Sequence, residues 1–117
     1  MLNEVDIIKK LQNEMKNVPC DVHGIGDDAA VFPLSDRISY VISKDLLAED
    51  THFRLRYFDP ESLSHKALHV NLSDLAAMGA TPQYVLLGLS IPKYLNQGWM
   101  DRFLEGIGSV CQKLGIC

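Results

Sequence analysis

Cysteine is scarce in this sequence, and its three cysteines, Cys20, Cys111 and Cys117, include no CxxC pair. An odd count without that spacing indicates neither a zinc knuckle nor a closed disulfide framework, and it favours a reducing, cytoplasmic setting. A basic excess is also missing, because 11 Lys and Arg stand against 15 Asp and Glu. We therefore expect no nucleic-acid partner, since a nucleic-acid binder usually carries a basic face.

Long apolar runs are lacking as well. The N-terminal residues mix charged and apolar types throughout, so we expect no signal peptide. The longest strongly apolar stretch, around Tyr84–Ile91, is far shorter than the ~20 residues that cross a bilayer, so we expect no membrane segment.

What the chain does have is enough length and apolar content for one folded domain. Its 117 residues are 47% hydrophobic and 22% charged, a composition that excludes a disordered tail and a collagen-like chain. A chain of this length can bury roughly two thirds of its unfolded surface. It is nevertheless small for an enzyme that binds two substrates.

Apolar periodicity predicts three helices. The first has Asn3 as its N-cap and ends before Pro19. The second begins after an N-cap at Asp59 and runs to about Met78, and the third covers roughly Gln97–Leu114.

Three apolar runs predict strands. Ala29–Phe32 and Ile38–Ser43 flank a turn and predict a β-hairpin. Gln83–Ile91 is apolar on both faces, which favours a central position in a sheet. The order helix, strands, helix, strand, helix indicates an α+β or α/β fold.

Asp74 is the most informative single position. On the second predicted helix it continues the spacing of Leu63, Ala67 and Val70, which places a carboxylate on the face that should be buried. Burying an ionised carboxylate without a partner is costly. Three interpretations are open: a salt bridge with Lys or Arg, a cap on a neighbouring loop, or a cation or polar site at the edge of the core. Asn71, close to the same face, favours the polar site.

Two loop segments add further carboxylates. Gly24–Asp28 reads GIGDD, in which glycines let the backbone approach a ligand and adjacent acids suit a hard cation such as Mg²⁺. Ser43-Lys44-Asp45 ends the second hairpin strand, a common place for ligand-binding groups. The ordinary alternatives are a solvated turn and a surface ion pair of Lys44. Convergence of the acids would require divalent cations to offset their repulsion.

The histidines give a weaker signal. His65 and His69 are four residues apart on the second predicted helix, a spacing typical of metal ligands. No HExxH pattern surrounds them, so an exposed helix face is the favoured interpretation. His52 lies in a long loop beside Phe53, where composition alone assigns it no role.

Three stretches carry a resemblance that covers nearly the whole chain: Gly24–Ala30 (GIGDDAA), Ser43–Phe53 (SKDLLAEDTHF) and Lys66–Pro82 (KALHVNLSDLAAMGATP). They resemble the N-terminal domain of the thiamine-monophosphate kinases, relatives of aminoimidazole ribonucleotide synthetase. GIGDDAA followed by HF favours the thiamine-phosphate branch over its relatives. The resemblance implies an α+β fold in which helices pack a mixed β-sheet.

The resemblance also implies a function, the ATP-dependent phosphorylation of thiamine monophosphate to thiamine diphosphate in a cytoplasmic homodimer. Mg²⁺ ions would hold the polyphosphate, since phosphoryl transfer needs positioning and charge neutralisation more than covalent help. No catalytic side chain is assigned. Residue by residue, the resemblance assigns metal binding to Asp28, Ser43, Lys44, Asp45 and Asp74, a neighbouring position to Asp27, and substrate contact to His52.

The chain departs from the family pattern in three respects. Lys44 stands where a small residue, often Thr, is common. Asp50 stands where Gly is usual, and Asp tolerates a left-handed backbone better than most residues do. The sequence also stops before a GGD segment and a second domain. We therefore expect residues 1–117 to form a single N-terminal Mg–ATP-binding domain, incomplete at its C-terminal end and inactive alone. The alternatives are a non-catalytic dimerisation or binding module, and a related enzyme with another phosphate acceptor.

Overall fold

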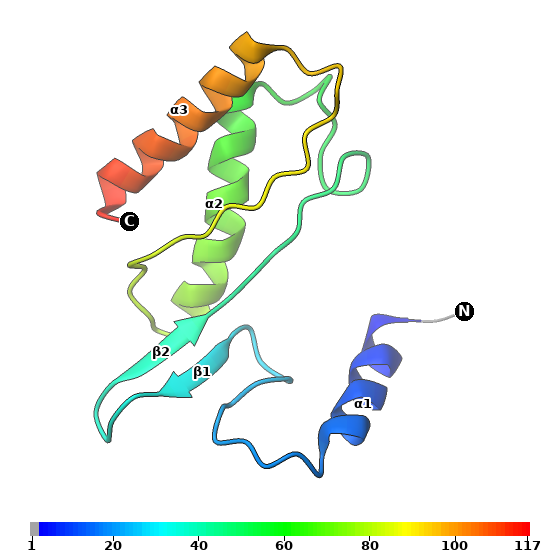
Figure 1. The fold of residues 1–117 in the computed structure, drawn as a ribbon, viewed down its shortest axis with the longest axis vertical. Helices are drawn as coiled ribbons and strands as arrows, with labels where there is room; N and C mark the ends of the chain where they lie inside the picture. Colours follow the sequence, from blue (N-terminus) through cyan, green and yellow to red (C-terminus); the bar gives the residue numbers. More distant parts are fainter. Residues whose placement is uncertain (1–2) are drawn as a thin grey trace.

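The computed structural model describes residues 3–117 as three helices and a two-stranded antiparallel sheet (Figure 1), which confirms the α+β class. In chain order the elements are α1 (Glu4–Met15), β1 (Ala30–Pro33), β2 (Ser39–Ile42), α2 (Pro60–Ala77) and α3 (Gln97–Leu114). None of these helices is both long enough and apolar enough to cross a bilayer.

Helices α1 and α2 each start at the predicted N-cap. The side chain of Asn3 accepts a hydrogen bond from the backbone N–H of Asp6, and Asp59 accepts one from that of Ser62. Asn96 caps α3 in the same way, a role that the sequence analysis did not assign. Gly115 ends α3 with φ 67, the left-handed conformation that favours glycine.

The core lies mainly between α2 and α3, which run side by side (Figure 1). Ser64 on α2 is fully buried, and a Cβ placed on Gly106 of α3 would collide with its Oγ. The two helices therefore approach closely at a point where one contributes only a hydrogen atom. The buried apolar residues are Ala29, Leu63, Leu68, Phe103, Val110 and Ile116.

The hairpin forms as predicted, with Ala30 opposite Ile42 and Pro33 opposite Ser39. The predicted strand over Gln83–Ile91 is wrong, because that segment forms no strand. Within residues 3–117 its backbone bonds only to the C-terminal residue: Val85 N donates to Cys117 O (2.8 Å) and Cys117 N to Gln83 O (2.9 Å). This is the pattern of a single parallel bridge. A longer strand would need a partner along its whole edge.

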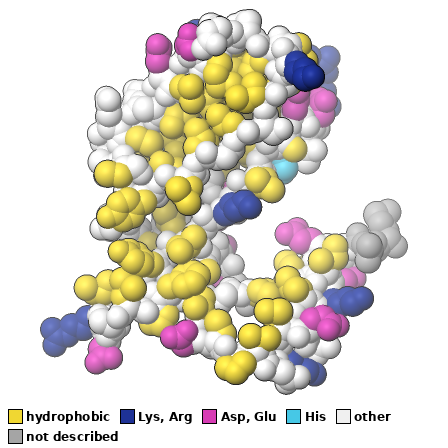
Figure 2. All heavy atoms as spheres, viewed as in Figure 1, with side chains coloured by type: hydrophobic (Ala, Val, Ile, Leu, Met, Phe, Trp, Pro, Cys, Tyr) yellow, Lys and Arg dark blue, Asp and Glu magenta, His cyan; other side chains and the backbone are white. Residues whose placement is uncertain are grey.

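The molecule is flat and open. Its extents are 49 × 41 × 21 Å and its radius of gyration is 17.1 Å, against about 13 Å for a compact domain of this length. Its accessible surface is 9207 Å², whereas a compact protein of this mass exposes about 6,400 Å². Helix α1 stands apart from the other helices (Figure 1), and apolar side chains cover much of the face in Figure 2. Leu86, for example, is completely exposed.

Candidate functional site

The site centres on the place where the chain leaves β2 and passes α2. Ser43 follows β2, and its Oγ donates a hydrogen bond to Asp74 Oδ2 (3.1 Å). The backbone N–H of Asp45 donates to Oδ1 of Asn71 (2.8 Å), which lies about one helical turn before Asp74 on α2. The Asn71 amide is itself fixed, because its Nδ2 donates to Ala67 O (2.9 Å). Two predicted residues of the strand end are thus bound to the predicted polar face of α2.

Asp74 is half-buried and has no Lys or Arg partner within residues 3–117. The interpretation in which Asp74 forms a salt bridge with Lys or Arg is therefore wrong as far as the described residues are concerned. Its observed partner is a neutral hydroxyl, which leaves the carboxylate charge without a compensating cation. The structure thus has a partly buried carboxylate near the C-terminal end of α2, beside the segment that follows β2.

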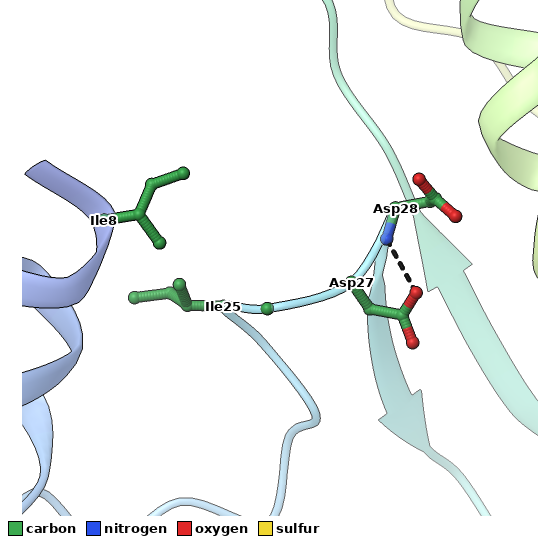
Figure 3. A pocket seen from close by; sticks show the side chains of 5 residues that line it. Ile8, Ile25, Asp27 and Asp28 are labelled. Carbon is green, nitrogen blue, oxygen red and sulfur yellow. Dashed lines mark hydrogen bonds between the residues drawn. The ribbon is translucent and has the colours of Figure 1, made fainter. Parts of the chain in front are cut away.

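The second predicted segment, Gly24–Asp28, forms an exposed turn that leads into β1 (Figure 3). Gly26 has φ 117, a conformation that side-chain-bearing residues rarely adopt. The N–H of Asp28 donates to Asp27 Oδ1 (2.9 Å), and His23 Nε2 lies 3.4 Å from Asp27 Oδ2. An open hollow of about 530 Å³ lies here, lined by Ile8, Ile25, Gly26, Asp27 and Asp28.

The hairpin relates this turn to the strand end. In the antiparallel register the last pair at this end is Ala30 with Ile42, so Asp28 precedes β1 and Ser43 follows β2 at the same end of the hairpin. The turn and the Ser43–Asp45 segment therefore leave the same end of the sheet. Within residues 3–117 no three His, Cys, Asp or Glu side chains gather closely enough to hold a metal ion. The acids lie in two groups, Asp27 with Asp28, and Asp74 with the Ser43–Asp45 segment.

His52 lies in a loop tied to its surroundings on two sides. Its Nδ1 accepts a hydrogen bond from Ala48 N (2.9 Å), and its carbonyl oxygen accepts one from Lys66 Nζ of α2. The Lys66 ammonium also lies 5.2 Å from the centre of the Phe58 ring, a cation–π contact. The sequence alone predicted no role for Lys66, although this lysine stands within the KALHVNLSD stretch.

Tyr94 anchors the same loop from the segment before α3. Its hydroxyl donates to Glu49 Oε2 (3.1 Å), and this hydrogen bond raises the pKa of Tyr94 above its usual value. The next residue, Asp50, has φ 65, a left-handed conformation that Asp tolerates better than most residues with a Cβ.

The donor set is chemically suited to Mg²⁺. It offers carboxylate, hydroxyl and backbone carbonyl oxygens, the ligands that this hard cation prefers, and no thiolate lies among them. The carboxylate of Asp74 is partly buried without a cationic partner within the described residues, which is the charge state that a bound cation would neutralise. Lys44 is exposed and can contribute only its backbone carbonyl as an oxygen ligand.

Fold and site together define the class of protein. The model of the family "AIR synthase related protein, N-terminal domain" matches residues 26–117, and the chain belongs to this family. Curated relatives that it matches include thiamine-monophosphate kinases. The chain is 34% identical to that of Bacillus subtilis (strain 168) over 112 residues, which are 95% of this chain and 34% of the relative. It is 38% identical to that of Escherichia coli (strain K12) over 105 residues, 89% of this chain and 32% of the relative.

Two solved structures share the fold. The structure "AaThiL complexed with AMPPCP and TMP" matches 98% of this chain and 35% of its own, with a TM-score of 0.85 and 29% identity. That of thiamine monophosphate kinase from Aquifex aeolicus matches 99% of this chain and 36% of its own, with a TM-score of 0.71 and 25% identity. This chain therefore spans about a third of the length of the relatives that it matches.

Proposed function

We propose that the chain supplies part of the Mg²⁺–ATP site of an enzyme that phosphorylates thiamine monophosphate to thiamine diphosphate. The observation that carries this proposal is the junction at which Ser43 and the Asp45 backbone bind Asp74 and Asn71 of α2. The matching structure of AaThiL was complexed with AMPPCP and TMP, which supports a nucleotide and a thiamine phosphate as the ligands.

The residues that would hold Mg²⁺ are Asp28, Ser43, Lys44 through its carbonyl, Asp45 and Asp74, with Asp27 beside them. When bound, the metal would neutralise phosphate charge during transfer. The chain's own contribution is to orient these oxygens: Asn71 holds the Asp45 backbone, and Ser43 holds one oxygen of Asp74. The closely packed α2–α3 pair gives this part of the site a rigid base.

His52 is proposed to contact the substrate. Because Ala48 N–H donates to Nδ1, the neutral ring carries its proton on Nε2. An exposed N–H is thereby available to a phosphate or other acceptor on the substrate. Lys66 and Tyr94 position this loop rather than take part in the reaction.

A cytoplasmic homodimer is part of the proposal. The flat fold exposes roughly 2,800 Å² more surface than a compact protein of its mass, as much as an extensive interface buries. Apolar side chains of the hairpin and of the 84–94 segment contribute to this exposed surface. Sedimentation of the purified chain measures the oligomeric state directly.

The decisive experiment is calorimetric titration of the chain with AMPPCP in the presence and absence of Mg²⁺, for wild type and Asp74→Asn. We expect Mg²⁺-dependent binding that Asp74→Asn weakens by about tenfold or more, since a lost charge-assisted contact is worth ~1.5–3 kcal/mol. Asp36→Asn, the same change in the exposed hairpin turn, is the matched control and should bind like wild type.

Other outcomes point elsewhere. A stable dimer without Mg²⁺-dependent nucleotide binding would overturn the proposal in favour of a dimerisation module. Nucleotide binding that another phosphate acceptor enhances, and thiamine monophosphate does not, would favour a different branch of the family.

A further inference from the structure

The face of α2 that points away from the proposed site carries a histidine pair. His65 and His69 are one turn apart and both exposed, and their rings stack with centroids 4.6 Å apart and planes 5° from parallel. At about 100° of rotation per residue, the pair lies on the opposite side of the helix from Asn71 and Asp74. The proposed phosphate chemistry therefore makes no use of these two side chains.

The ring of His69 is oriented by the helix itself. Its Nδ1 lies 2.9 Å from the carbonyl oxygen of His65. A carbonyl oxygen can only accept, so Nδ1 carries the proton and the lone pair of the neutral ring is on Nε2. Metal-ligating histidines usually have this arrangement, in which one ring nitrogen donates to a backbone carbonyl and the other is left for the metal.

We propose that His65 and His69 form a binding site for a borderline transition-metal ion such as Ni²⁺, Zn²⁺ or Cu²⁺. Imidazole nitrogen is a good ligand for these ions. Two nitrogens about 2.0–2.1 Å from one ion lie roughly 3.3 Å apart. The stacked rings are nearly parallel, so binding requires the exposed side chains to rotate until the lone pairs of both rings point at the same ion. The site is thus a chelate made by two ligands on one helix.

Water completes the coordination. Within residues 3–117 no third His, Cys, Asp or Glu gathers with the pair. Glu61, one turn before His65, has both carboxylate oxygens bound to Arg102 (2.7 and 2.8 Å). The site is therefore open and weaker than a four-ligand structural zinc site. It differs from the Mg²⁺ site in ligand type as well as in place, because Mg²⁺ prefers oxygen.

The test is calorimetric titration of the purified 117-residue chain with NiCl₂, repeated with ZnCl₂, in a millimolar excess of Mg²⁺. The variants are His65→Gln, His69→Gln and the double variant, all at exposed helix positions where Gln is a good helix former. His23→Gln is the matched control, since His23 is exposed and outside the pair. The three cysteines are common to all variants, so the differences report on the histidines alone.

We expect each single variant to lose about tenfold or more in Ni²⁺ affinity, and the double variant to lose little more than either single one. A chelate loses its advantage when the first ligand is removed. Ni²⁺ should also raise the thermal midpoint of the wild-type chain by linkage, but not that of the variants. Far-UV circular dichroism checks that the variants keep their helices. Equal affinities for wild type and the three variants, equal loss in His23→Gln, or displacement of Ni²⁺ by Mg²⁺ would each overturn the proposal.

Discussion

Ser43 donates a hydrogen bond to Asp74 across 31 residues of sequence, at an Oγ–Oδ2 distance of 3.1 Å. This contact joins the end of the hairpin to α2, two parts that share little other packing. The acceptor is a partly buried carboxylate, and hydrogen bonds to charged groups are stronger than those between neutral groups. The contact therefore has two effects: it fixes the geometry of the proposed site, and it holds the hairpin to the helix pair.

A double-mutant cycle with Ser43→Ala and Asp74→Ala measures this coupling. We expect an interaction free energy of about 1–2 kcal/mol in urea unfolding, because each single change removes the same hydrogen bond. Ser35, whose Oγ accepts from Ile38 N in the hairpin turn, is the control partner, and Ser35→Ala with Asp74→Ala should be additive. Additivity in the Ser43 cycle itself would contradict the contact.

The close approach of α2 and α3 gives a second prediction. Gly106→Ala places a methyl group against Ser64, whose Cβ would lie 3.0 Å from it and whose side chain is fully buried. We expect a loss of about 1–3 kcal/mol in the free energy of unfolding, as for other overpacked cores. Gly108→Ala, two residues on in the same helix, meets nothing within 4 Å and should stabilise by about 0.5–1 kcal/mol through helix propensity.

A rescue experiment separates the steric cause from others. Ser64→Ala in the Gly106→Ala background removes the nearest atom and should recover part of the loss. If Gly106→Ala were as stabilising as Gly108→Ala, the helices would not meet as described.

The pair Glu61–Arg102 predicts a pH dependence of stability. Arg102 donates from two nitrogens to the Glu61 carboxylate, and this hydrogen bond lowers the pKa of Glu61 below its ordinary value of 4.5. A carboxylate whose pKa is lower in the folded state stabilises that state fully above the unfolded pKa. The contribution is lost as pH falls through the folded pKa.

We therefore expect wild type to lose more stability than Glu61→Gln when pH is lowered from neutral through 4.5. Because both side chains are about half exposed, the difference should be small and should shrink in high salt. Glu14→Gln on the exposed helix α1 is the control and should follow wild type. Parallel curves for wild type and Glu61→Gln, measured by urea unfolding across this pH range, would count against the ion pair.

Features with local signals in the sequence were predicted correctly. Caps such as Asn3 and Asp59, and the hairpin turn, depend on residues within a few positions of one another, so spacing is enough to predict them. The prediction of a strand over Gln83–Ile91 was wrong because a strand needs a neighbour, and the described part of the chain offers that segment only Cys117. Apolar composition indicates that a segment tends to be buried. It does not indicate which other segment packs against it.

The same reasoning applies to the site. The spacing of Asp74 predicted a carboxylate on the inner face of α2, and the resemblance to the family placed Asp74 and Ser43 together among the metal-binding positions. The role of Asn71 in holding the Asp45 backbone, and that of Lys66 in holding the His52 loop, required coordinates. Both are side chain–backbone contacts, 26 and 14 residues apart, and no sequence spacing encodes them.

Asp50 gives the last prediction, because it is the only non-glycine residue with positive φ in the described part of the chain. Its φ of 65 costs energy for any residue with a Cβ, although Asp bears that cost better than Ala does. Asp50→Gly relieves the strain and loses only an exposed contact with Arg54 at 3.8 Å. The gain is partly offset by the greater freedom of glycine in the unfolded chain. We expect Asp50→Gly to raise the free energy of unfolding by up to about 0.5–1 kcal/mol and Asp50→Ala to lower it by about 1 kcal/mol. Urea unfolding of the two variants beside wild type measures both, and a stabilising Asp50→Ala would show that the loop does not adopt this left-handed conformation.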